Sequence, residues 1–352
     1  MEIRVEDQDE DGAPIELAEP ETLSDRLLEM AGATVLSLYR RPALATAIST
    51  GVGWGIRYEQ LWRRALGGRR RRPHINWHEG GRGPALVLIN GFTGSGIGWP
   101  TVWVSELEKH FRVIRVDNRG TGWSRRAPMP FTISDMADDI ADVLTACGLE
   151  TATVFGQSMG GMIAQEFAMR HPHRVDRLVL CATIPPVPAF TANPHGVSLA
   201  AGIAFPSGRD IRRPTKQQLT DFLDALHKFT AAGYEPPDNR LEEFAAQNLV
   251  RGTSRYGAFC QGRAINAWRD PSRLRHIYTP TVIVQGAADR VVVPANGHSL
   301  AELIPGAEYV EVPGVGHLIP WEATQVLTDL LMKDREHPTT SNPHQPKEND
   351  HG

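Results

Sequence analysis

The sequence predicts an α/β fold with a mostly parallel central sheet that is flanked by helices and interrupted by an inserted helical cap. Short apolar runs alternate with segments of helical periodicity, which is the pattern of strands buried on both faces of a parallel sheet. This alternation stops at residue 185 and resumes after residue 276. The intervening residues carry helical patterns of their own and are too many for a plain loop, so we expect them to form the cap.

Apolar runs mark the strands of the predicted core, which comprises residues 73–184 and 277–336. Before the insertion we predict strands over residues 74–78, 85–89, 111–116, 152–155 and 177–181. After it we predict strands over residues 281–284 and 309–312. The Gly-rich residues 79–84 are expected to form a hairpin turn between the first two strands.

Helical periodicity follows most of these strands. We predict core helices over residues 133–147, 159–170, 295–303 and 321–332, and cap helices over residues 216–229, 241–250 and 259–268. Thr132, with Asp135 three residues later, gives a capping-box pattern at the start of the first core helix. Residues 337–352 are polar and contain prolines, so we expect a disordered tail.

The N-terminal region carries two opposite charge blocks. Residues 1–21 contain nine acidic residues and one arginine, and we expect them to be disordered, whereas residues 40–72 contain nine arginines and one glutamate. Apolar residues at helical spacing predict that residues 22–72 form a helical extension with a basic linker. It is interpreted either as a helical hairpin docked on the core or as a segment in peripheral contact with an anionic membrane surface.

Composition indicates a large globular core and sets limits on its surroundings. The chain has 352 residues, 41% of them hydrophobic, and a net charge of -4. The three cysteines, Cys147, Cys181 and Cys260, lie in apolar or helical stretches, which argues against a disulfide framework and favours the cytoplasm. The acidic first residues do not form a secretory signal. We expect no metal, no cofactor and no nucleic-acid partner, and peripheral contact with the inner membrane surface is the alternative location for the extension.

A serine framed by glycines follows the apolar residues 152–155 and precedes a helical pattern. Gly156, Ser158 and Gly160 match the nucleophile elbow Gly-x-Ser-x-Gly, in which a strand turns sharply into a helix and exposes the serine. Serine in a Gly-rich turn also occurs as a plain turn residue. The strand before it and the helix after it favour the nucleophile.

A serine nucleophile needs a base within hydrogen-bond reach and an acid that orients the base. Asp289 lies just past the strand predicted over residues 281–284, and His317 lies just past the last strand. A single loop aspartate or histidine is more often a turn former or a solvated residue. The order Ser158, Asp289, His317, with each residue at a strand end, predicts a catalytic triad.

Acyl transfer also needs hydrogen-bond donors for a developing oxyanion. We expect the backbone N–H of Met159, at the start of the helix after the elbow, to be one donor. The backbone N–H of Phe92, in the turn after residues 85–89, is expected to be the other. The alternative for this turn is a Gly-rich loop without a role in chemistry.

These motifs together resemble those of the capped α/β-hydrolase family, especially its esterase, 3-oxoadipate enol-lactonase and methylesterase-like members. Residues 117–124 match the family's Asp-x-Arg-Gly-x-Gly-x-Ser turn, residues 156–162 its elbow, and residues 286–289 and 316–317 its acid and base loops. The resemblance covers residues 74–332 and leaves out the N-terminal extension. One departure is Asn90-Gly91, where the family usually has His-Gly. Asparagine can hydrogen-bond nearby backbone, so we expect the loop to keep its shape.

The resemblance implies a serine hydrolase that cleaves a small to medium apolar carboxylic ester or lactone through an acyl-enzyme. A C–C bond hydrolase or a lyase on the same scaffold is one alternative, because residues 90–95 also resemble the His-Gly-Phe loop of menaquinone-pathway lyases. A non-catalytic ligand-binding or scaffold protein with this fold is the alternative of another class. Candidate pocket residues, each with core packing as the other interpretation, are Trp123, Phe222, Phe229, Phe259, Trp268 and Trp321.

Overall fold

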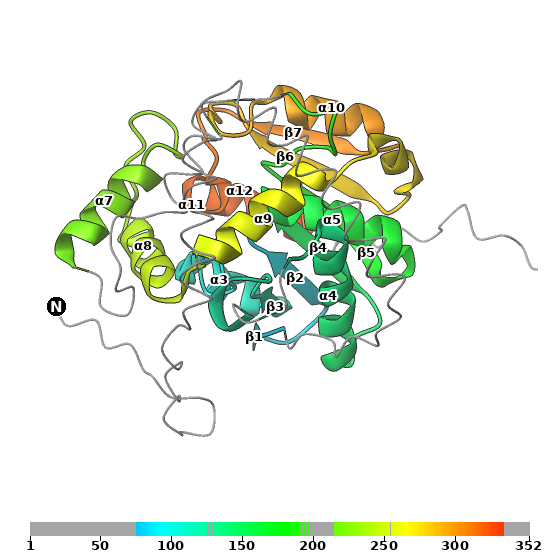
Figure 1. The fold of residues 1–352 in the computed structure, drawn as a ribbon, viewed down its shortest axis with the longest axis horizontal. Helices are drawn as coiled ribbons and strands as arrows, with labels where there is room; N and C mark the ends of the chain where they lie inside the picture. Colours follow the sequence, from blue (N-terminus) through cyan, green and yellow to red (C-terminus); the bar gives the residue numbers. More distant parts are fainter. Residues whose placement is uncertain are drawn as a thin grey trace, which may run out of the picture.

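The computed structural model is built on a seven-stranded sheet with the order β1-β3-β2-β4-β5-β6-β7 (Figure 1). It describes residues 75–124, 127, 130–191, 193, 196, 215–253 and 255–333. The predictions for residues 1–21, 22–72 and 337–352 therefore lie outside the described residues. The strands are β1 (Trp77–Gly80), β2 (Ala85–Ile89), β3 (Arg112–Val116), β4 (Ala152–Gln157), β5 (Val175–Cys181), β6 (Thr281–Gly286) and β7 (Glu308–Val312).

The sheet is parallel except at one edge, as the apolar runs predicted. Every neighbouring pair from β3 through β7 is parallel, and only β1 pairs antiparallel, with β3. The predicted hairpin between the first two strands is wrong, because β3 lies between β1 and β2. The turn at Gly81, with φ 73°, packs against the backbone entering β3, where an added Cβ would lie 2.2 Å from the Phe111 carbonyl oxygen.

Helices cover both faces of the sheet and bury alternate residues of its strands. On one face, Val87 and Val154 pack with α4 (Ile133–Ala146), α5 (Met159–Arg170) and α10 (Ala295–Leu303). On the other, Leu86 and Phe155 pack with α3 (Thr101–Glu108) and α12 (Thr324–Lys333). The fully apolar central strands are explained by this burial on both faces.

Two helices differ from the sequence predictions. Helix α3 was not predicted, because its eight residues follow a Gly-rich loop and span only two turns. The closing helix predicted over residues 321–332 is two helices, α11 (Ile319–Glu322) and α12, which are separated at Ala323. The capping box predicted for α4 is present, since the Thr132 side chain accepts from the Asp135 N–H and the Asp135 carboxylate accepts from the Thr132 N–H.

Three helices occupy the described part of the insertion between β5 and β6. They are α7 (Lys216–Leu226), α8 (Arg240–Arg251) and α9 (Arg255–Ala267), followed by the short 3-10 helix η3 (Pro271–His276). Leu226 and Leu241 join the core that contains α3, whereas Cys260 of α9 joins the core that contains α5. The inserted helices therefore contribute to both hydrophobic cores. In Figure 1, α9 passes in front of the sheet. The exact limits of the cap at residues 185 and 276 stay a prediction.

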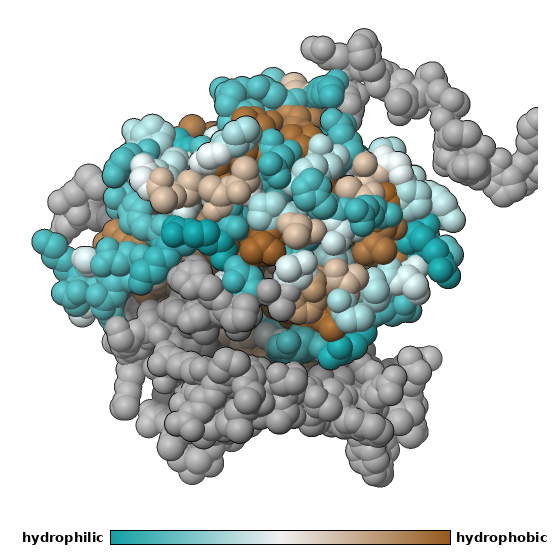
Figure 2. All heavy atoms as spheres, turned by 90° about the horizontal axis from the view of Figure 1, so that it is seen from above, coloured by the Kyte–Doolittle hydropathy of each residue, from teal (hydrophilic) through white to brown (hydrophobic). Residues whose placement is uncertain are grey.

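The described surface is mixed in polarity. On the face shown in Figure 2, apolar side chains form small patches that are separated by hydrophilic ones. None of the helices that the structure describes has both the length and the apolar character required to cross a membrane.

Replacing Gly160 by alanine should destabilise the fold, because its Cβ would lie 2.0 Å from the Ile89 carbonyl oxygen at the end of β2. We expect a loss of about 1–3 kcal/mol in the free energy of unfolding. Gly262→Ala on α9 is the control, since no atom lies within 4 Å of the added Cβ, and it should stabilise by up to about 1 kcal/mol. Chemical denaturation measures both variants, and equal stability of the two would contradict the expectation.

Candidate active site

Ser158 lies at the tip of a strained turn between β4 and α5. Its backbone has φ 53° and ψ -120°, a conformation that residues other than glycine rarely adopt. Two hydrogen bonds fix the turn: the Ser158 N–H donates to the Cys181 carbonyl at 2.9 Å, and the Thr183 hydroxyl donates to the Ser158 carbonyl at 2.6 Å. The Ser158 side chain makes no capping bond to α5, so its hydroxyl is available to other groups.

The elbow also needs glycine at position 156, two residues before Ser158. A Cβ on Gly156 would lie 2.3 Å from the Gly160 carbonyl oxygen and would push the strand away from the helix. The glycines of the sequence motif are therefore explained by backbone contacts within the turn and, at Gly160, with the end of β2.

His317 and Asp289 form a buried pair beside the elbow. The His317 Nδ1 lies 2.8 Å from the Asp289 Oδ2, and both residues are 4% exposed. Because a carboxylate accepts hydrogen bonds, this contact assigns the Nδ1 as the protonated nitrogen and leaves the Nε2 as an acceptor. The Asp289 Oδ1 accepts from the Val291 and Val292 N–H groups at 2.8 and 2.9 Å, which holds the carboxylate in place.

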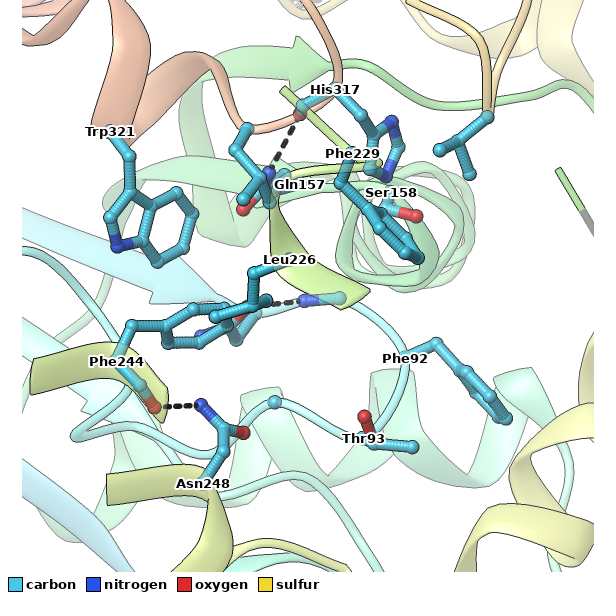
Figure 3. A pocket seen from close by; sticks show the side chains of 15 residues that line it. Phe92, Thr93, Gln157, Ser158, Leu226, Phe229, Phe244, Asn248, His317 and Trp321 are labelled. Atoms are coloured by element: carbon cyan, nitrogen blue, oxygen red, sulfur yellow. Dashed lines mark hydrogen bonds between the residues drawn. The ribbon is translucent and has the colours of Figure 1, made fainter. Parts of the chain in front are cut away.

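One pocket brings Ser158 and His317 together, and in Figure 3 the His317 imidazole lies next to the Ser158 side chain. Asp289 does not line the pocket but lies behind His317. The lining residues are Asn90, Gly91, Phe92, Thr93, Gly94, Gln157, Ser158, Leu226, Phe229, Phe244, Asn248, Val291, His317, Leu318 and Trp321.

Asn90 holds the loop after β2 through both ends of its amide. Its Oδ1 accepts from the Gly91 N–H at 2.7 Å, and its Nδ2 donates to the Ser95 carbonyl at 3.1 Å. The prediction that asparagine keeps this loop in shape by bonding nearby backbone is confirmed. The Asn118 side chain adds a bond to the Asn90 carbonyl at 2.9 Å, which connects the loop to the turn at residues 117–124.

Two backbone N–H groups beside Ser158 are unused. The Thr93 N–H donates to the Gln261 side chain at 2.9 Å, and the Gly94 N–H donates to the Gly91 carbonyl at 3.1 Å. Within the described part of the chain, the N–H groups of Phe92 and Met159 have no protein acceptor. Met159 begins α5, where the first N–H groups of a helix lack partners inside the helix.

The structure places only two of the six candidate pocket residues, Phe229 and Trp321, in the pocket lining. Trp123 is 38% exposed and contacts His78 in a tilted arrangement, with ring centres 4.9 Å apart and 47° between the ring planes. Phe222 is buried in the core that contains α3, and Phe259 packs against the core that contains α5.

Trp268 has a structural contact instead of a place in the pocket. Its indole N–H donates to the buried Glu166 carboxylate at 3.1 Å, which connects the end of the insertion to α5. The structure does not place Trp123, Phe222, Phe259 or Trp268 in the lining of this pocket, and their contact with a substrate stays a prediction. Aromatic type alone did not separate core residues from lining residues.

Sequence reasoning missed several lining residues, including Leu226, Phe244, Asn248, Val291 and Leu318. The sequence spacing could have indicated part of this lining, because Phe244 and Asn248 are four residues apart and therefore share one face of α8. Nothing in the sequence indicates which face of α8 turns toward the elbow. Among the described residues no group of three or more His, Cys, Asp or Glu side chains is arranged to hold a metal ion.

Comparison with known proteins supports the fold over most of the chain. Residues 84–324 match the family model described as alpha/beta hydrolase fold. A protein of Yersinia enterocolitica named as a candidate carbamate hydrolase, RutD, is 29% identical over 70% of this chain and 85% of its own length. The Rhodomycin D methylesterase DauP of a Streptomyces species is 29% identical over 69% of this chain and 89% of its own.

A solved structure agrees in architecture. The enol-lactonase from Burkholderia xenovorans LB400 superposes with a TM-score of 0.60 at 25% identity, over 74% of this chain and 96% of that one. The family match covers well over half of the sequence and includes β2 through α11. The chain therefore belongs to the alpha/beta hydrolase fold family.

Proposed function

We propose that this chain is a serine hydrolase that cleaves small to medium, largely apolar carboxylic esters or lactones through an acyl-enzyme. The observation that carries the proposal is the placement of Ser158 and His317 in one apolar pocket, with Asp289 bonded to the far nitrogen of His317. The similarity to a methylesterase and an enol-lactonase supports this class of reaction.

In the proposed reaction, His317 takes the proton of the Ser158 hydroxyl while the serine oxygen attacks the substrate carbonyl. The hydrogen bond from the His317 Nδ1 to Asp289 keeps the Nε2 free to accept that proton and stabilises the imidazolium that forms. The protonated His317 then gives the proton to the departing alcohol. Water, activated by the same histidine, hydrolyses the acyl-enzyme and regenerates Ser158.

The N–H groups of Phe92 and Met159 are the proposed oxyanion donors. Met159 follows Ser158 in the chain, and Phe92 lines the same pocket. Neither N–H has an acceptor within the described structure, whereas the Gly91, Thr93 and Gly94 N–H groups next to Phe92 are already used. A preorganised donor of this kind typically contributes about 3 kcal/mol to the transition state.

Ser158→Ala tests the nucleophile. We expect kcat for p-nitrophenyl butyrate to fall by a factor on the order of 10⁶, because a missing nucleophile cannot be replaced by its neighbours. The thermal unfolding midpoint should stay close to that of the natural chain. Undiminished turnover would contradict the proposal. In the natural chain, labelling by a fluorophosphonate without any ester hydrolysis would favour the C–C hydrolase or lyase, and no labelling would favour a non-catalytic protein.

Asp289→Asn tests the orienting acid. An amide at this position can donate to the histidine and favour the wrong tautomer, so kcat should fall by about 10⁴, as in serine proteases with the equivalent change. Steady-state kinetics with the same ester measures the loss. A KM effect without loss of kcat would argue that Asp289 has no role in orienting His317.

Glu322 fixes the backbone on both sides of His317. Its Oε2 accepts from the Gly316 N–H at 2.9 Å and the Ala231 N–H at 2.7 Å, and its Oε1 accepts from the Leu318 N–H at 3.0 Å. Burial raises the pKa of the Glu322 carboxyl, and these three backbone donors oppose the shift. Glu322 therefore acts as a positioning residue that ties the histidine loop to the segment after α7.

Glu322→Gln should lower kcat about tenfold to a hundredfold with little change in KM, because one end of an amide donates and must face a backbone N–H. Fluorophosphonate labelling of Ser158 should slow by a similar factor. Glu166→Gln is the matched control, since Glu166 is also buried and accepts from Ser134, Trp268 and Arg273 away from His317. Equal loss of kcat in both variants at equal thermal stability would assign Glu322 a general structural role.

A further inference from the structure

We propose that the pocket selects uncharged substrates that carry an N–H or O–H group, and that Asn248 is the specificity-determining residue that accepts this hydrogen bond. This inference rests on the proposed function, because it concerns the esters or lactones that the same pocket would bind. It follows from the orientation of two side-chain amides, Asn248 and Gln157, and from the absence of lysine and arginine among the lining residues within the described part of the chain.

The orientation of the Asn248 amide is fixed by its own helix. The Asn248 Nδ2 donates to the Phe244 carbonyl, four residues earlier on α8, at 2.9 Å. A carbonyl oxygen can only accept, so the nitrogen must face it and the Oδ1 must point elsewhere. Figure 3 shows this oxygen directed away from Phe244, on the side of the pocket where Thr93 lies. No donor among the described residues bonds to the Asn248 Oδ1.

Gln157 shows the same arrangement beside the nucleophile. Its Nε2 donates to the His317 carbonyl at 3.1 Å, which again leaves the amide oxygen without a protein donor in the described structure. Gln157 as a whole is only 3% exposed. In the view of Figure 3 the two amides lie at opposite ends of the pocket. Both ends therefore present a hydrogen-bond acceptor.

Few donors remain among the other lining residues that the structure describes: they include the backbone N–H of Phe92, proposed for the oxyanion, and the Trp321 indole N–H. Both the oxygen and the nitrogen of the Asn90 amide are hydrogen-bonded within its own loop. The Thr93 hydroxyl can donate or accept a hydrogen bond. The other large side chains of the lining are mainly apolar, and no lysine or arginine is among the lining residues that the structure describes. A substrate carboxylate would lose its water here and face amide oxygens without a cation to pair with it.

Substrate recognition follows from the cost of leaving the acceptor of the half-buried Asn248 unpaired once a substrate has covered it. A substrate with an amide or carbamate N–H, or with a hydroxyl, can donate to the Asn248 Oδ1 once water is expelled. An analogue without that hydrogen leaves the acceptor unpaired, and sites built around such groups discriminate strongly against the analogue. We expect about a tenfold preference for the donor-bearing member of a matched pair.

Two substrate pairs test the preference in the natural chain. On the acyl side, the pair is the p-nitrophenyl ester of N-acetyl-β-alanine and its N-methyl analogue. On the alcohol side, the pair is 2-acetamidoethyl butyrate and its N-methyl analogue, and their hydrolysis is measured from the butyric acid that is released. The N–H member of at least one pair should have the higher kcat/KM, by about tenfold. The p-nitrophenyl half-ester of glutaric acid should be hydrolysed about a hundredfold more slowly than p-nitrophenyl butyrate.

Two variants assign the preference to Asn248. Asn248→Leu removes the acceptor, so the ratio of kcat/KM within the preferred pair should fall to about one. Asn266→Leu is the matched control on α9, because the exposed Asn266 makes the same bond to a carbonyl four residues earlier, Gly262, at 2.9 Å, and lies outside the lining. It should keep the ratio of the natural chain.

The outcomes separate this inference from the proposed function. Equal kcat/KM within both pairs, or efficient hydrolysis of the glutarate half-ester, would overturn the inference while hydrolysis of p-nitrophenyl butyrate still supports a serine esterase. A preference that persists in Asn248→Leu would assign donor recognition to another group and also overturn it. Failure of the natural chain to hydrolyse any of these esters would instead contradict the proposed function.

Discussion

The close approach of β2 to the start of α5 is the constraint on which the rest of the site depends. Gly160 touches the backbone at the end of β2, and this contact sets the distance between the elbow and the loop that begins at Asn90. A side chain at Gly160 would separate the two segments. Because they stay together, the loop after β2 lies against the elbow, where a Cβ added at Gly91 would lie 3.1 Å from the Ser158 Cβ.

A parallel sheet extends this constraint to the acid and the base. The loops after β2, β4, β6 and β7 all leave from the carboxyl edge, so Asp289 and His317 arrive beside the elbow although 28 residues separate them in sequence. The two loops pack tightly, since a Cβ on Gly286 would lie 2.3 Å from the Gly316 carbonyl oxygen. The buried contact between Asp289 and His317 therefore follows from backbone packing as well as from charge.

The inserted helices contribute to the site in two ways. They form part of the pocket wall through Leu226, Phe244 and Asn248. They also hold the core loops in place, because the His317 N–H donates to the Phe229 carbonyl at 2.7 Å and Gln261 bridges the loop after β2 to the Arg119 carbonyl. The insertion therefore both lines the pocket and positions His317 and the loop after β2. A change in the insertion is expected to alter both the shape of the pocket and the position of these groups.

The sequence by itself determined the family, the strand and helix pattern of the core apart from α3 and the break in the closing helix, and the candidate roles of Ser158, Asp289 and His317. Those features depend on local periodicity, on glycines at fixed spacing and on the order of residues along the chain. Only the tertiary structure decided that β3 lies between β1 and β2, that the closing helix breaks at Ala323, and which residues line the pocket. Trp268 and Phe229 are both aromatic residues of the insertion, yet one bonds to Glu166 and the other faces Ser158. The difference arises because the side of a helix or loop that faces the site depends on contacts between segments distant in sequence, which local spacing does not specify.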